Sequence, residues 1–325
     1  MSKLSLAARP PNDLNGALVF FFLPVGHDQD VYSWPWRTLT IMVACLGALL
    51  WSRSVEVESR REVERVVGLA FQYAEANPEA AISPAVHAVL PSPLRWWTAT
   101  LVAEHDEDPS VSLELELAML DARDAWRRMP VQRFGYVPAE HRPHTLLTAM
   151  FMHGGWGHLV GNMLILYLLG MVIECFWAGW AFLALYGLCG VAGALAHHWI
   201  APSSDTPLVG ASGAIAGVMA AFVLGHARTR INLFYFVFLF FFVRFGQVRV
   251  PALWLIGGWV VVQVWNAWGN ANDGVSYAAH LGGFLVGSVC TLIARRRRWI
   301  ATDAGFLWAG RQLEPPVPHG QQSQG

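Results

Sequence analysis

A serine hydroxyl at the start of an apolar, small-residue segment is the group in this sequence best suited to covalent chemistry. Ser212 lies within Gly210-Ala211-Ser212-Gly213, after a loop-like stretch at residues 202–207 that begins and ends with proline. A serine becomes an effective nucleophile when an adjacent base takes its proton, so Ser212 could attack a carbonyl carbon. Alternatively, Ser212 could cap a helix or pack as a small residue, as most such serines do.

A histidine in a later apolar segment could supply that base. An ionisable side chain such as His280 is costly inside a membrane and therefore suggests a function. Small residues let helix backbones approach closely, so two small-residue stripes would bring its imidazole to Ser212. The stripes are Ala279, Gly283 and Gly287 on one segment and Gly213, Gly217 and Ala221 on the other. The alternative is a lone histidine that bonds a backbone carbonyl.

Two further polar side chains share one face of another apolar segment. His158 and Asn162 are four residues apart, a spacing that places both on the same side of a helix. Both can donate hydrogen bonds, and paired donors could hold the oxyanion of an acyl-transfer intermediate. They could instead bond neighbouring helices or form a metal-ligand pair.

The composition indicates which elements must position these groups. Hydrophobic residues make up 54% of the chain and charged residues only 14%, whereas a soluble domain carries about 25% charged residues. We therefore expect an all-α polytopic membrane protein with the lipid bilayer around it. The net charge of -1 argues against a nucleic-acid partner. The cysteines form no C-x-x-C pair, so we expect free thiols, no metal and no cofactor.

Six apolar segments are candidates for transmembrane helices, near residues 36–51, 156–173, 180–200, 212–225, 252–268 and 277–294. Basic residues favour the cytoplasmic side, and Arg228, Arg244 and Arg295 agree with a cytoplasmic N-terminus. The same rule makes the apolar run 232–245 a cytoplasmic-side interfacial element, such as a short hairpin, rather than a further span. The expected organisation is a cytoplasmic segment (1–34), the first span (35–52), an extramembrane insertion (53–143), the core with spans two to six (144–295) and a disordered cytoplasmic tail (296–325).

The insertion at residues 53–143 is rich in charge. Its residues 55–76 and 110–128 have helix-like periodicity, and prolines interrupt the segment between them. We expect a partly helical insertion, either a small subdomain or a docking surface, without a catalytic motif of its own.

The short fourth segment predicts the depth of the serine. From Ser212 to His226 a helix covers only ~21 Å at 1.5 Å per residue. Measured from the cytoplasmic face, Ser212 would lie roughly 10 Å below the outer edge of a ~30 Å core. The loop at 201–211 must then dip into the membrane, which requires surrounding protein or a water-filled cavity.

Together these motifs resemble the rhomboid family of intramembrane serine proteases. The resemblance covers roughly residues 134 to 295 and rests on His158-x-x-x-Asn162, Gly210-Ala211-Ser212-Gly213 and Ala279-His280-x-x-Gly283-x-x-x-Gly287. It implies six helices and a Ser-His dyad, with Ser212 as nucleophile and His280 as general base and then acid. It also implies an oxyanion site of His158, Asn162 and the Ser212 backbone N–H, supported by Gly210, Gly213, Gly283 and Gly287.

The sequence also departs from the family pattern. Ala216 stands where some members carry an aromatic residue against the histidine, which leaves the orientation of His280 without an assigned partner. The region near His144 and Thr145 lacks the Trp-Arg pair that some members carry in the first outer loop. The resemblance implies that the fifth span and the loop before the sixth act as a lateral gate for a substrate helix, and Gln263, Trp265 and Trp268 could line this gate. For the tryptophans the alternative is a place in the interfacial belt.

The expected function is an intramembrane serine endopeptidase that cleaves single-span membrane proteins near the outer face of the membrane. The alternative is a non-catalytic rhomboid-like protein that binds membrane helices. A transporter is disfavoured, because the spans contain no paired intramembrane acids. The expected location is a multi-pass integral membrane position, in the plasma (inner) membrane if the source is bacterial.

Overall fold

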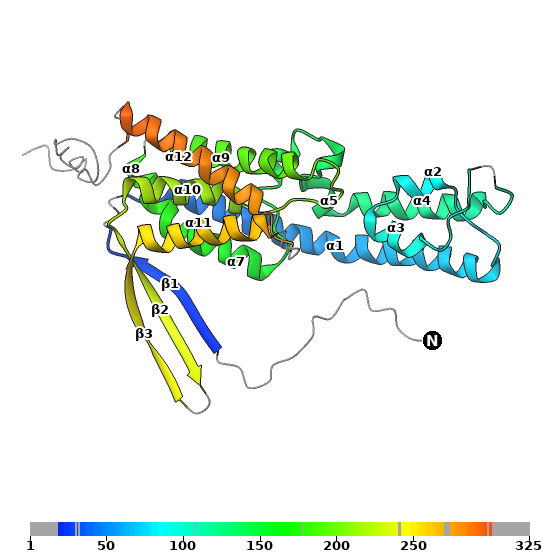
Figure 1. The fold of residues 1–325 in the computed structure, drawn as a ribbon, viewed down its shortest axis with the longest axis horizontal. Coiled ribbons are helices and arrows are strands. Elements are labelled where there is room, and N and C mark those ends of the chain that lie inside the picture. Colours follow the sequence, from blue (N-terminus) through cyan, green and yellow to red (C-terminus); the bar gives the residue numbers. More distant parts are fainter. Residues whose placement is uncertain are drawn as a thin grey trace, which may run out of the picture.

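The molecule is elongated, with a bundle of apolar helices at its centre, a helical insertion at one end and a projecting sheet near the other (Figure 1). The computed structural model describes residues 19–29, 31, 33–106, 108–177, 179–239, 242–269, 274–297 and 299–300. Residues 1–18, and residues 301–325 of the predicted disordered tail (296–325), lie outside the described residues.

The central bundle contains most of the predicted spans. Helices long and apolar enough to cross a membrane are α1 (Trp36–Ala76), the continuous unit α7–η2–α8 (Trp156–Ile165, Leu166–Gly170 and Met171–Phe176), α9 (Gly179–Ile200) and α12 (Tyr277–Arg296). Helices α10 (Ser212–Gly225) and α11 (Ala252–Trp268) are apolar but shorter. The expectation of a mainly helical membrane protein is confirmed, and the count of six spans stays a prediction.

Helix α1 differs from the predicted first span, because it does not end near residue 52. It continues without a break to Ala76, for 41 residues in all. Its second half joins α2 (Pro84–Val89), α3 (Ser92–Thr98) and α4 (Leu113–Arg128), and these helices bury their own apolar cluster, with Ile82, Leu94 and Leu115 almost fully enclosed. The serine at 112 caps α4, where its hydroxyl accepts from Leu115 N. The insertion therefore has a core separate from the central bundle.

Helix α10 lies at the centre of the bundle, packed between α9 and α12, and is buried from Gly213 to Val223. Small residues make this possible. A Cβ built on Gly283 would overlap the carbonyl oxygen of Gly213, and one on Gly287 would lie 2.5 Å from Gly217 Cα. The backbones of α10 and α12 thus touch along the two predicted stripes, as small residues permit.

A buried carboxylate ties the second span to the start of the first. Glu174 in α8 accepts hydrogen bonds from the backbone N–H groups of Arg37 and Thr38, at 2.9 and 2.8 Å. The Thr38 hydroxyl and the Arg37 guanidinium also contact this carboxylate. Helix starts leave N–H groups without partners, so a negative charge there is favourable.

A three-stranded antiparallel sheet departs from the all-α expectation. Strand β2 (Arg230–Leu239) pairs with β3 (Phe242–Pro251). A hairpin was one form considered for the run 232–245, and its place at the cytoplasmic interface stays a prediction. Strand β1 (Val19–His27) adds to the outer edge of β2, and it lies within the segment 1–34 that was expected to be a cytoplasmic N-terminal segment. Pairing satisfies backbone groups that an isolated apolar strand would leave open. Near the start of the predicted tail, Ile300 forms an antiparallel bridge with Trp177.

Candidate active site

The structure brings Ser212 and His280 together across the α10–α12 contact. The Ser212 Oγ and the His280 Nε2 are 2.9 Å apart, within hydrogen-bond distance. Both residues are half-buried, and Ser212 is the first residue of α10. The N-cap position belongs to Ala211, so the serine hydroxyl does not serve as a helix cap. The close packing at Gly283 is what sets this distance.

The other ring nitrogen of His280 is bonded to an amide on α11. Gln263 Oε1 lies 2.7 Å from His280 Nδ1, and Gln263 Nε2 is 3.4 Å from the carbonyl oxygen of Trp259. Trp259 and Tyr277 place rings beside the imidazole, with centroids 5.7 and 6.4 Å away. From the sequence Gln263 was expected at a gate, and its contact with His280 was not predicted. The available signal was an amide within an otherwise apolar helix.

The two donors on α7 lie against the loop that leads to the serine. Gly210 has φ of +123°, a conformation that favours glycine. A Cβ there would lie 2.7 Å from His158 Nε2 and 3.7 Å from Asn162 Nδ2. The Asn162 amide nitrogen is buried and has no hydrogen-bond partner among the described residues. An unpaired buried donor is costly, so this nitrogen is suited to meet an acceptor brought by a ligand.

His153 closes the site behind His158. Its ring packs edge-on against the His158 ring at 5.2 Å, and its Nδ1–H donates to the Phe151 carbonyl oxygen at 3.1 Å. The side chain is 2% exposed, and this burial lowers the pKa of His153 to about 4. The imidazole is therefore neutral near pH 7, and its bond to Phe151 lies within the loop before α7.

A small cavity of about 20 Å³ opens beside the serine. Small side chains and glycines form much of its wall, together with Leu146, Met150 and Leu208. The small members are Ala149, Gly190, Ala194, Gly210, Ser212, Gly213 and Ala279. This space suits one water molecule or a very small side chain. In the described part of the chain, no three His, Cys, Asp or Glu side chains gather as a metal site would require.

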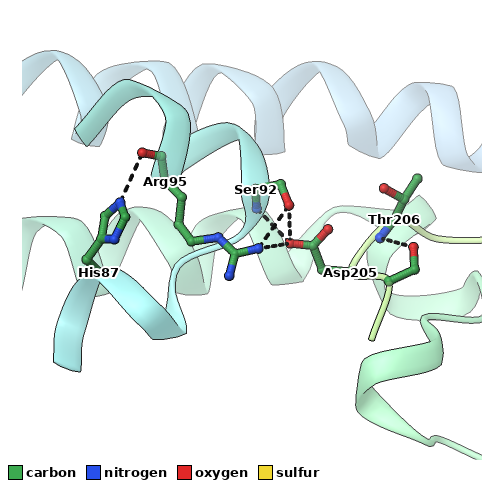
Figure 2. A network of polar contacts seen from close by, with 6 residues as sticks. His87, Ser92, Arg95, Asp205 and Thr206 are labelled. Atoms are coloured by element: carbon green, nitrogen blue, oxygen red, sulfur yellow. Dashed lines mark hydrogen bonds and ion pairs between the residues drawn. The ribbon is translucent and has the colours of Figure 1, made fainter. Parts of the chain in front are cut away.

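The loop before Ser212 is fixed at several points. Leu208 exchanges both backbone hydrogen bonds with Tyr136, at 2.9 and 2.8 Å, and Gly210 N donates to the Ala149 carbonyl oxygen at 2.9 Å. Figure 2 shows a further contact, in which the Asp205 carboxylate meets residues of α3 in the insertion. It accepts from Ser92 N at 2.7 Å and from Arg95 at 3.0 Å. The insertion therefore touches the loop that positions the serine.

Comparison with known proteins identifies the region that contains the site. Residues 140–297 match the Rhomboid family, described as the rhomboid domain. RHOMBOID-like protein 12, mitochondrial, of Arabidopsis thaliana is 30% identical over 175 residues, which cover 49% of this chain and 48% of that protein. Rhomboid protein 1, mitochondrial, of Saccharomyces cerevisiae is 30% identical over 152 residues, 44% of this chain and 39% of that protein.

A third relative, named for the chloroplast, has a similar identity and coverage. Rhomboid-like protein 11, chloroplastic, of Arabidopsis thaliana is 27% identical over 158 residues, 45% of this chain and 50% of that protein. This chain thus spans about half the length of the curated relatives it matches, or less. The matched residues contain Ser212, His280, His158, Asn162 and Gln263, and they lie in a multi-pass membrane protein. Residues 140–297 of this chain therefore form a domain of the rhomboid family.

Proposed function

We propose that this protein is an intramembrane serine endopeptidase that uses Ser212 and His280 as a catalytic dyad. The observation that carries the proposal is the 2.9 Å contact between Ser212 Oγ and His280 Nε2 inside a bundle of apolar helices. A serine with an oriented base within hydrogen-bond reach is the arrangement that nucleophilic catalysis needs. The unpaired Asn162 amide beside Gly210 adds a donor where an oxyanion would form.

The reaction would proceed in two halves. Ser212 Oγ attacks the scissile carbonyl carbon while its proton passes to His280 Nε2, and the carbonyl electrons move onto oxygen. Asn162, His158 and the Ser212 N–H stabilise that oxyanion. The imidazolium then protonates the leaving amine as the C–N bond breaks, which leaves an acyl ester on Ser212. Water attacks the ester and gives its proton to His280, and Ser212 Oγ recovers a proton as the carboxylic acid departs.

The topology belongs to the same proposal. Helices α10 and α11 complete six spans, with α10 surrounded by protein, which permits a helix shorter than the hydrocarbon core. The insertion and the dyad face the same end of the bundle, so cleavage takes place near the outer face. The small wall around Ser212 favours small residues at the cut in a single-span membrane substrate. Relatives named for mitochondria and chloroplasts give no support to a bacterial plasma membrane.

Labelling with a fluorophosphonate tests the proposal, together with cleavage of single-span substrates in reconstituted vesicles. Ser212→Ala and His280→Ala should each lose labelling and cleavage while the protein still inserts. Ser288→Ala provides a matched control, because its hydroxyl bonds Phe284 O on α12, away from the dyad. Full activity of Ser212→Ala would overturn the proposal. Helix binding by a wild-type protein that neither labels nor cleaves would instead support the non-catalytic alternative.

A further inference from the structure

This inference rests on the proposed protease function and concerns how its base is held. We propose that Gln263 is the positioning residue of the dyad, which fixes the tautomer and direction of His280 in place of an acidic third member. Because Gln263 is carried by α11, the dyad is competent only when α11 is seated against α12.

The hydrogen-bond network sets the direction of each group. Gln263 Nε2 faces the Trp259 carbonyl oxygen, which can only accept, so the amide nitrogen is the donor there. Gln263 Oε1 then faces His280 Nδ1 at 2.7 Å, and an amide oxygen can only accept. His280 Nδ1 must therefore carry the proton. Its Nε2 is left with a free lone pair directed at Ser212, which is the tautomer a general base requires.

The location of Gln263 makes this bond hard to replace. The residue is 4% exposed, so water has little access to the Nδ1–H if the amide is removed. When His280 takes the serine proton, the imidazolium gains charge in a water-poor site. The oxygen of the amide dipole then points at that charge, and a hydrogen bond to a charged group is stronger than a neutral one. No aromatic ring at position 216 can do this work, because the residue there is alanine.

Helix α11 is attached to the bundle along a narrow line. Its buried residues are Ala252, Ile256 and Gln263, and the side chains of Val261, Val262 and Trp265 are exposed. Near its middle, α11 contacts α12 through Gln263 and through Trp259, whose ring lies 6.4 Å from that of Phe284. A displacement of α11 would break the bond to His280 Nδ1. The position of this helix is therefore linked to the state of the base.

The test removes the side-chain oxygen of Gln263 and keeps the volume of the side chain. Gln263→Met fills the same space without an oxygen, and we expect kcat and the labelling rate of Ser212 to fall about 10- to 100-fold with KM unchanged, as expected for loss of one hydrogen bond to a charged group. Val262→Met is the matched control, since this neighbour is 52% exposed and lies outside the site. It should behave as the wild type.

Gln263→Glu supplies a second readout that a purely structural role would not move. The new carboxylate would again place a hydrogen-bond acceptor beside His280 Nδ1, so activity should return. Because this carboxylate favours the imidazolium, the acidic limb of the pH–rate profile should move to higher pH. The groups that face the ring are Ser212 from α10, Trp259 from α11 and Tyr277 on α12. Further titratable side chains at the site are His158 on α7 and His153, which packs against it. The fluorophosphonate labelling rate is followed from pH 5 to pH 9.

The outcomes separate this inference from the proposed function. A wild-type protein that neither labels nor cleaves contradicts the protease itself. An active wild type with an equally active Gln263→Met contradicts only the role of Gln263. If Gln263→Met fails to fold by thermal melting, the Glu variant decides: an unchanged acidic limb overturns the inference, and a displaced limb with retained activity supports it.

Discussion

The Asp205 carboxylate accepts a hydrogen bond from the first backbone N–H of α3, at Ser92, with a distance of 2.7 Å. The Ser92 hydroxyl and Arg95 also bond the same oxygen, at 2.6 and 3.0 Å (Figure 2). Asp205 lies seven residues before Ser212 on the loop that leads into α10. The insertion and the proposed dyad are thus joined by one short stretch of chain.

Asp205→Ala should loosen this loop. The contacts are partly exposed, so their contribution to global stability is small, roughly 0.2–1 kcal/mol. The effect should be local, with faster amide hydrogen exchange at residues 203–211 and a fall in kcat of about two- to fivefold. Glu58→Ala, on the exposed face of α1, is the control. Unchanged exchange and unchanged kcat would show that the insertion does not restrain the loop.

Gly283→Ala should separate the two halves of the dyad. The new methyl group would overlap the Gly213 carbonyl oxygen, so α12 must move away from α10. Overpacking of this kind costs about 1–3 kcal/mol or more, and a shifted His280 loses contact with Ser212. Thermal melting and fluorophosphonate labelling measure the two effects. Gly257→Ala is the matched control, because a Cβ there meets nothing within 4 Å. Wild-type labelling in Gly283→Ala would refute the close-packing argument.

Stability should fall as the solution is acidified. Burial lowers the pKa of His153 to about 4, from an ordinary value of 6.5. Between these values the unfolded chain binds a proton that the folded protein resists, so stability is lost as pH falls through this window. From pH 7 to pH 5 the loss from this residue is about 2 kcal/mol. Melting temperatures of the wild type and His153→Gln should therefore converge as pH falls.

The control for this measurement is His105→Gln, a change at an exposed position of the insertion. Its melting temperature should follow the wild type at every pH. A wild-type curve that runs parallel to that of His153→Gln between pH 7 and pH 5 would contradict the assignment.

Seating of α11 can be tested with a double-mutant cycle. Ile256 is 2% exposed and anchors the first half of α11, so Ile256→Ala should let the helix shift and lower kcat through the Gln263–His280 bond. Combined with Gln263→Met, which has already removed that bond, it should cost little more. Strongly non-additive effects on kcat are thus expected. Additive losses would mean that Ile256 and Gln263 act independently.

Local sequence signals were enough to bound the helices that carry Ser212 and Gln263. The predicted bounds of α10 and α11 agree with the structure, because His226 and Pro251 mark clear changes in pattern. The end of α1 was missed, since charged residues from Arg53 onward mark the limit of a membrane span but do not stop a helix. Strand β1 was missed because its partner lies some 200 residues away in the sequence.

In the site, too, the features that local sequence predicts differ from those that depend on distant contacts. Ser212, His280, His158 and Asn162 stand out by residue type and by spacing within one helix, so the sequence was sufficient to select them. The contact of Gln263 with His280 depends on how α11 rotates against α12, which no local pattern encodes. The link between Asp205 and Ser92 likewise joins segments that are 113 residues apart.

The unbroken course of α1 has a mechanical consequence. A helix of 41 residues is about 60 Å long, roughly twice the thickness of the hydrocarbon core. The first half of α1 would lie in the lipid, and the second half packs in the insertion. Because the helix is continuous, the membrane part and the insertion cannot tilt independently. Local thinning of the bilayer around Trp36 would tilt α1 and displace the insertion at its far end. The displacement would act on the contact between the insertion and Asp205.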